Sequence, residues 1–138
     1  MSQPTQRQAR YADHSLPSAL LKRNFLLTLL STRRCDLEQL IQQCQEAPAQ
    51  IRRAEEKIAA FEASPPALVP GDFPFRREFM RSCLQMALSD AHSDLALLVQ
   101  QCQEARDQIK SYEDDLVLLT ALIEQRTREA VNIPQPTC

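Results

Sequence analysis

The sequence predicts an all-α protein in which one helical unit occurs twice, as helical hairpins or as an antiparallel coiled-coil-like bundle. Apolar residues recur at alternating steps of three and four, which places them on one face of a helix. A shift of 58 residues aligns the first half of the chain with the second. The 138 residues include a single glycine. This excludes glycine-rich phosphate-binding loops and argues against a sheet of tight hairpins.

The internal duplication is clearest in residues 36–51 and 94–109, which read DLEQLIQQCQEAPAQI and DLALLVQQCQEARDQI. When residues 21–62 are aligned with 79–120, 16 of the 42 pairs are identical. Similar composition alone does not produce such a match. We therefore expect the two halves of the chain to share one structure.

Each half contains a continuous apolar seam at the a and d positions of a heptad repeat, as in a helix packed along a partner helix. Shorter and more broadly apolar segments, 20–30 and 79–88, precede the seams and are expected to need neighbours on more than one side. The two seams consist of Leu37, Leu40, Cys44, Ala47, Ile51, Ala54, Ile58 and Phe61, and of Leu95, Leu98, Cys102, Ala105, Ile109, Tyr112, Leu116, Leu119 and Ile123.

The predicted organisation is one domain overall with five segments. Residues 1–15 are expected to form a flexible N-terminal tail and residues 16–63 the first helical repeat. A proline-rich linker is predicted over 64–74, the second helical repeat over 75–131, and a C-terminal tail over 132–138.

Two architectures are open because Ser31 and Ser89 occupy equivalent positions at which a new helix can be capped. If the chain turns there, which we favour, the halves form a pseudo-symmetric four-helix bundle in which Cys44 and Cys102 approach each other. If it does not, the chain is a long hairpin that pivots in the linker and places Cys35 opposite Cys102. Pro48, inside the first seam, is expected to kink its helix.

Charge and targeting signals point to a cytoplasmic protein without a membrane partner, and they disfavour a nucleic-acid partner. The 16 basic and 18 acidic residues give a net charge of −2, which favours neither nucleic acid nor an anionic membrane. No secretory signal or membrane-spanning stretch is recognisable. The arginine pairs 33–34, 52–53 and 76–77 offer phosphate contacts, but aromatic residues for base stacking are scarce.

No catalytic residue, cofactor or metal site is predicted, and we do not expect an enzyme. Cys44 and Cys102 occupy the same seam position and are interpreted as small buried apolar residues, with a redox or metal-binding thiol pair as the alternative. His92, between acidic residues, is interpreted as part of a polar turn, with acid–base chemistry as the alternative. Cys138 is expected to be an exposed thiol.

The sharpest feature is the duplicated motif QQCQEA at 42–47 and 100–105. Only its a and d residues belong to the seam, yet its polar residues are also identical in both copies. One interpretation is that these polar side chains hydrogen-bond across a pseudo-twofold axis, and the other is a twofold partner-binding patch. The candidate partner-binding residues are Gln42, Gln43, Gln45, Glu46, Gln100, Gln101, Gln103 and Glu104.

The leading functional hypothesis is a non-enzymatic helical protein–protein interaction module, that is, an adaptor, chaperone-like or regulatory protein. Its expected partner is another protein or a second copy in a homodimer, bound through helix-face packing. The first alternative is a structural stalk or scaffold component of a larger assembly, such as a secretion apparatus or phage particle. The second is a small regulator of nucleic-acid processing that uses the arginine pairs.

Overall fold

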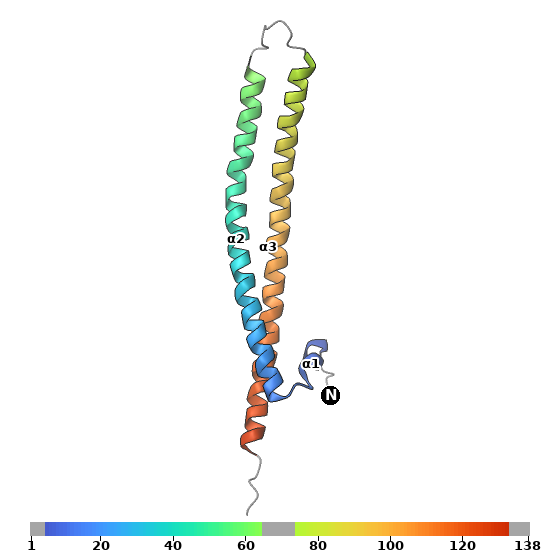
Figure 1. Ribbon diagram of the computed structural model, residues 1–138, viewed down its shortest axis with the longest axis vertical. Coiled ribbons are helices and arrows are strands. Elements are labelled where there is room, and N and C mark those ends of the chain that lie inside the picture. The colour runs from blue at the N-terminus through green and yellow to red at the C-terminus, as the bar shows by residue number, and fades with distance from the viewer. Residues whose placement is uncertain (1–4, 65–73, 133–138) are drawn as a thin grey trace, which may run out of the picture. The chain divides into compact units, whose positions relative to one another are not determined.

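In the computed structural model, which describes residues 5–64 and 74–132, the chain forms three α-helices and no strand (Figure 1). The short helix α1 spans Gln6–Tyr11, α2 spans Leu16–Ala63 and α3 spans Pro74–Val131. The predicted all-α class is therefore confirmed. Most of the proline-rich linker, and the C-terminal thiol of Cys138, lie outside the described residues.

Both long helices continue through the points at which a turn was expected. Ser31 lies inside α2 and Ser89 lies inside α3, so the favoured helix–turn–helix within each half is wrong. Serine favours an N-cap, but it also fits a helix interior. Without a neighbouring glycine or proline, nothing at these positions interrupts the backbone hydrogen bonds. The helix α2 also continues through Pro48, although proline removes one backbone donor there.

Burial along the two long helices follows the predicted heptad spacing. Every predicted seam residue, over 37–61 in α2 and 95–123 in α3, is buried or half-buried. The same alternating steps of three and four continue over 16–33 in α2 and 77–91 in α3, again without an exposed position. Each long helix therefore carries one continuous buried stripe, as expected for packing along a partner helix. In unit 1, α3 also buries Asp115, which lies outside this stripe.

The broader apolar segments that precede the seams are covered only in part. In the first, Leu26 and Leu30 are buried, whereas Phe25 remains 54% exposed. In the second, Phe79 and Met86 are 68% and 65% exposed. The sequence led us to expect neighbours on more than one side of these segments. Within the described residues, that cover is incomplete.

The contacts divide the chain into two units. Unit 1 comprises Met1–Leu37 with Glu104–Cys138, and unit 2 comprises Glu38–Gln103. Each unit contains one segment of α2 and one segment of α3. In unit 2, Cys44 lies beside Cys102 and Glu62 lies beside Arg81, and this order makes the two segments antiparallel.

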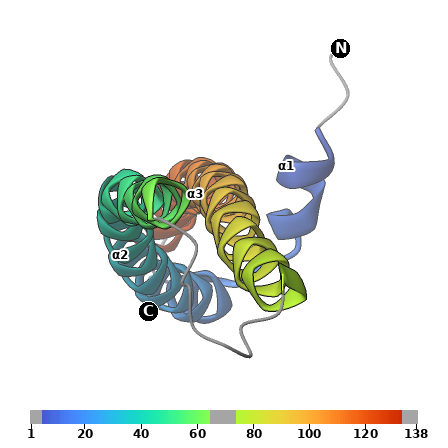
Figure 2. The ribbon, with the colours of Figure 1, turned by 90° about the horizontal axis from the view of Figure 1, so that it is seen from above.

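Unit 1 contains a third element, because α1 packs beside its helix pair (Figure 2). The buried cluster of unit 1 joins one residue of α1, Tyr11, to residues of both long helices. Half-buried Leu29 and Tyr112 pack against this cluster. The cluster consists of Tyr11, Ala19, Leu26, Leu119 and Ile123.

Helix α1 lies in the segment that was expected to be a flexible tail. Its start is a capping box, in which the Gln8 amide N–H donates to Thr5 Oγ1 at 3.1 Å and the Thr5 amide N–H donates to Gln8 Oε1 at 3.0 Å. Six residues are too few to form a stable helix in isolation. The helix therefore depends on its packing against both long helices and on its polar contacts with α3.

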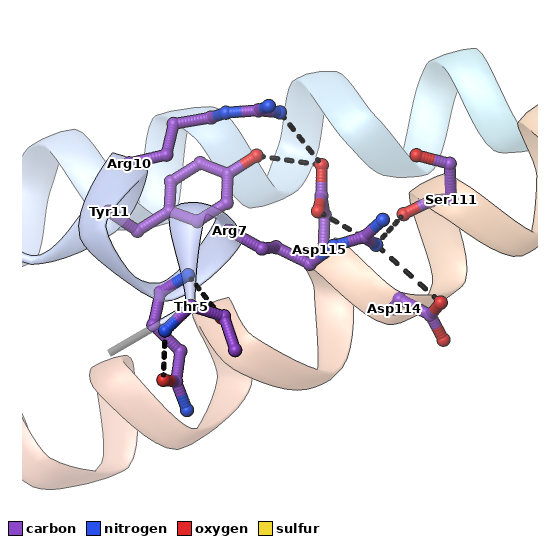
Figure 3. Close-up of polar contacts among 8 residues, drawn as sticks. Thr5, Arg7, Arg10, Tyr11, Ser111, Asp114 and Asp115 are labelled. Carbon is purple, nitrogen blue, oxygen red and sulfur yellow. Dashed lines mark hydrogen bonds and ion pairs between the residues drawn. The ribbon is translucent and has the colours of Figure 1, made fainter. Parts of the chain in front are cut away.

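Those contacts converge on Asp115, a buried carboxylate of α3 (Figure 3). The Tyr11 hydroxyl donates to Asp115 Oδ2 at 2.9 Å, and Arg7 Nη1 lies 3.1 Å from Asp115 Oδ1. Arg7 Nη1 also donates to the backbone carbonyl of Ser111 at 2.9 Å. Arg10 Nη1 lies 3.7 Å from Asp115 Oδ2, but its side chain is 63% exposed, so this ion pair contributes little. A buried carboxylate needs such partners, and α1 provides them.

Unit 2 is a pair of helices, and only Ala47, Ile51 and Cys102 are buried apolar residues among its described positions. At the end of α2, Arg77 Nη2 donates to the carbonyls of Phe61 and Ser64, at 3.2 Å and 2.9 Å. The Phe61 carbonyl also accepts from the Ser64 amide at 3.2 Å, and a cation is favourable at a helix C-terminus. These hydrogen bonds of Arg77 connect the start of α3 to the end of α2.

The burial of Tyr11 leads to a prediction about pH. Desolvation, and then the hydrogen bond to Asp115, raise the pKa of Tyr11 above its ordinary value, because ionisation would place a second negative charge beside the carboxylate. We expect the Tyr112→Phe variant, which retains Tyr11 as its one tyrosine, to titrate in ultraviolet absorbance at a higher pH when folded than in guanidinium chloride. Stabilisation by Tyr11 is then complete below about pH 10, the pKa of an unfolded tyrosine, and is lost as the pH rises through the folded pKa. A folded midpoint at or below the denatured one would contradict the α1–Asp115 contact.

Candidate partner-binding groove

The two cysteines of the duplicated motif lie side by side in unit 2. Their Sγ atoms are 3.7 Å apart, with Cys44 half-buried and Cys102 buried. These residues are also each other's counterparts in the 58-residue alignment. The structure therefore brings two positions that the alignment makes equivalent into contact.

This contact corrects the register that was expected for unbroken helices. A pivot in the middle of the linker places Cys35, not Cys44, opposite Cys102. Instead Glu62, one residue before the end of α2, pairs with Arg81, which is seven residues into α3. The first residues of α3 therefore extend beyond the end of α2. Cys35 is exposed.

The candidate patch residues do not form one cluster. Gln101 is half-buried, and the other seven are exposed. Gln42 Nε2 donates to Glu46 Oε1 at 3.3 Å, a contact between successive turns of α2. Glu104 belongs to unit 1, whereas the others belong to unit 2. Of the eight, Gln43 and Glu46 line a hollow in unit 2.

This first hollow has a volume of about 450 Å³ and lies between α2 and α3. Its charged side chains are Glu46 and Asp94, so we call it the acidic hollow. Its apolar side chains include Leu97, which is 52% exposed. The lining residues are Gln43, Glu46, Ala47, Gln50, Ala91, Asp94, Leu97 and Leu98.

A second hollow of about 390 Å³ shares Gln50 with the first. Its charged side chains are Arg53 and Lys57, so we call it the basic hollow. Gln43, Gln50 and Lys57 follow one another at intervals of seven residues, and so they lie on the same face of α2. The lining residues are Gln50, Arg53, Ala54, Lys57, Leu84 and Ala87.

The two hollows share Gln50 and carry opposite charges, and together we call them the groove of unit 2. Most of its lining was not predicted from the sequence, because the candidate residues were those that are identical in the two aligned segments. The signal in the sequence that could have identified these lining residues was their heptad position. Residues flanking the seam on one side, such as Lys57, Ala87 and Asp94, line the groove whether or not their counterparts match.

Three of the six arginines considered for phosphate binding contact other groups of the protein. Arg34 Nη2 contacts Glu113 at 3.0 Å, and Arg33 Nη1 contacts Asp36 at 3.4 Å. Arg77 binds the carbonyls at the end of α2. The structure thus assigns structural contacts to these three arginines. Arg53 lines the basic hollow.

The remaining candidates for chemistry are dispersed. His92 is exposed, as are the thiols of Cys35 and Cys83. Over residues 5–64 and 74–132, no three His, Cys, Asp or Glu side chains are grouped so as to hold a metal ion. None of the helices in this part of the chain is both long enough and apolar enough to pass through a bilayer.

The fold and the groove define an all-α protein with two long, packed helices and a hollowed side of mixed charge. No protein-family model, curated protein sequence or solved structure matches the chain.

The cysteine contact gives a direct test of the register. Because the Sγ atoms need to approach only from 3.7 Å to about 2.05 Å, we expect mild oxidation to form an intramolecular disulfide between Cys44 and Cys102. Trypsin leaves Cys35 and Cys44 on one peptide, so the link is assigned with variants in a Cys83→Ser background. Mass spectrometry should find it in Cys35→Ser and not in Cys44→Ser. A link that survives in Cys44→Ser would show that the register is wrong.

Proposed function

We propose that the chain is a non-enzymatic protein-interaction module that binds a helix of another protein in the groove of unit 2. One observation carries the proposal. In unit 1, the helix pair holds a third helix, α1, whereas the groove of unit 2 is open and combines exposed Leu97 with charged side chains. A third helix laid in such a groove buries apolar surface on both partners.

We further propose that the two repeats arose by duplication of one helix and pack as an antiparallel coiled coil. The heptad spacing of burial supports the packing, and the contact between the equivalent residues Cys44 and Cys102 supports the duplication. A twofold relation between identical helices places equivalent residues opposite each other at the axis. Such a scaffold suits an adaptor or regulatory protein acting in the cytoplasm.

A second copy of the chain is the other candidate occupant. The acidic hollow adjoins the basic hollow, and a face with both charges can pair with itself about a twofold axis. Sedimentation velocity over a range of concentrations distinguishes this homodimer from binding to a different protein.

The groove is tested by comparing two exposed apolar residues of α3 that lie two positions apart. Leu97 lines the acidic hollow and is 52% exposed, whereas Val99 is 56% exposed and is not among its lining residues. We expect Leu97→Asp to lower partner affinity by at least about tenfold, because burial of a leucine contributes roughly 1.5–3 kcal/mol. Val99→Asp should bind as the wild type does.

The readout is quantitative mass spectrometry of proteins retained from a native lysate by each immobilised variant. Circular dichroism checks that each variant remains helical. The proposal requires proteins that wild type and Val99→Asp retain and Leu97→Asp loses. Equal retention by both aspartate variants would remove the groove as the binding site.

A further inference from the structure

We propose that the basic hollow of unit 2 binds a short acidic amphipathic helix of another protein, in the manner in which unit 1 holds α1. This inference rests on the proposed function and specifies the chemistry of the partner. Its basis is that the chain contains two copies of one site. The chain's own helix α1 fills the copy in unit 1, and the copy in unit 2 is open.

The 58-residue alignment relates the basic hollow to the α1 site residue by residue. All six lining residues of the basic hollow have counterparts on the helix pair of unit 1. In the order Gln50, Arg53, Ala54, Lys57, Leu84 and Ala87, the counterparts are Gln108, Ser111, Tyr112, Asp115, Leu26 and Leu29.

Five of these six counterparts hold α1 or build the cluster beneath it. The Ser111 carbonyl accepts a hydrogen bond from Arg7, and Asp115 accepts one from Tyr11 (Figure 3). Leu26 belongs to the same buried cluster as Tyr11, and half-buried Leu29 and Tyr112 pack against that cluster. The alignment thus identifies the basic hollow as the second copy of a helix-binding site.

Differences in side-chain size explain why this second copy is hollow. Tyr112 of unit 1 corresponds to Ala54, and Leu29 corresponds to Ala87. Two large side chains are therefore replaced by methyl groups, and a volume of about 390 Å³ remains between the helices. One large apolar side chain from a partner helix fits this space and has the alanines and Leu84 to pack against.

Differences in charge define the rest of the partner. Asp115, which receives Arg7 and Arg10 of α1, corresponds to Lys57, and Ser111 corresponds to Arg53. A helix that binds as α1 does must therefore carry carboxylates where α1 carries arginines. The spacing of Arg7, Arg10 and Tyr11 then predicts a partner motif of two acidic residues three apart, followed directly by a large apolar residue. The α1 of a second copy has the wrong charge for this hollow.

The probe is a helix-stapled, fluorescein-labelled peptide of residues 5–16 that carries Arg7→Glu and Arg10→Glu. The comparison peptide has the natural sequence, and a third peptide has the acidic sequence with Tyr11→Ala. Fluorescence anisotropy measures the binding of each peptide to the full-length protein at low ionic strength. We expect the acidic peptide to bind in the micromolar range and to weaken with added salt.

Variants of the protein locate the binding. The double variant Arg53→Glu, Lys57→Glu should lower affinity for the acidic peptide by about tenfold or more, because attraction becomes repulsion. The single variant Arg53→Glu is also compared with its matched control Arg52→Glu, a charge reversal at an exposed residue outside the hollow. Arg52→Glu should have little effect. Lys57→Asp gives the hollow the negative charge that Asp115 has at the aligned position of unit 1. This variant should have lower affinity for the acidic peptide and higher affinity for the natural one.

The outcomes separate this inference from the proposed function. No binding of the acidic peptide up to about 1 mM overturns the inference, as does equal weakening by Arg52→Glu. Equal binding of the Tyr11→Ala peptide also overturns it, because a site for any polyanion, including nucleic acid, needs no apolar side chain. If Leu97→Asp still fails to retain proteins that the wild type retains, the proposed function stands. In that case only the proposed chemistry of the partner is wrong.

Discussion

The register between α2 and α3 in unit 2 is the constraint on which the groove depends. The contact of Cys44 with Cys102 and the ion pair of Glu62 with Arg81 fix this register at two levels. Because successive residues of a helix point about 100° apart, a shift by one residue would rotate a seam away from its partner. It would also separate Lys57 from Leu84 and Ala87, which line one hollow only in the observed register.

The two units use similar helix surfaces in different ways. In unit 1, Asp115 is buried, and it is stable there because Tyr11 and Arg7 approach it from α1. In unit 2, the corresponding Lys57 remains exposed at the edge of an open hollow. A buried carboxylate loses its hydration and needs hydrogen-bond or ion-pair partners from the protein, whereas an exposed lysine remains hydrated. The opposite charges of Asp115 and Lys57 thus accompany a covered helix pair in unit 1 and an open hollow in unit 2.

The seam was predictable because apolar spacing is a local property of the sequence, and every seam residue from 37 to 61 and from 95 to 123 avoids full exposure. The continuity of the helices through Ser31 and Ser89 was not predictable, because serine favours an N-cap and yet can also lie within a helix. Helix α1 escaped prediction because six residues do not form a helix by themselves, and its support from Asp115 comes from 104 positions away along the chain. The groove was not predictable either, because its lining comes from two helices. Which residues face each other depends on the register between these helices, and the sequence left two registers open.

Site-specific photo-crosslinking tests the central claim, that the hollowed side of unit 2 binds a partner protein, most directly. A photoreactive phenylalanine is placed at Ala87, which lines the basic hollow, or at Gln85, an exposed residue of α3 that is not part of either hollow. After irradiation in a native lysate, we expect a discrete adduct from position 87 that is absent from position 85. The same adduct from both positions, or from position 85 alone, would contradict it.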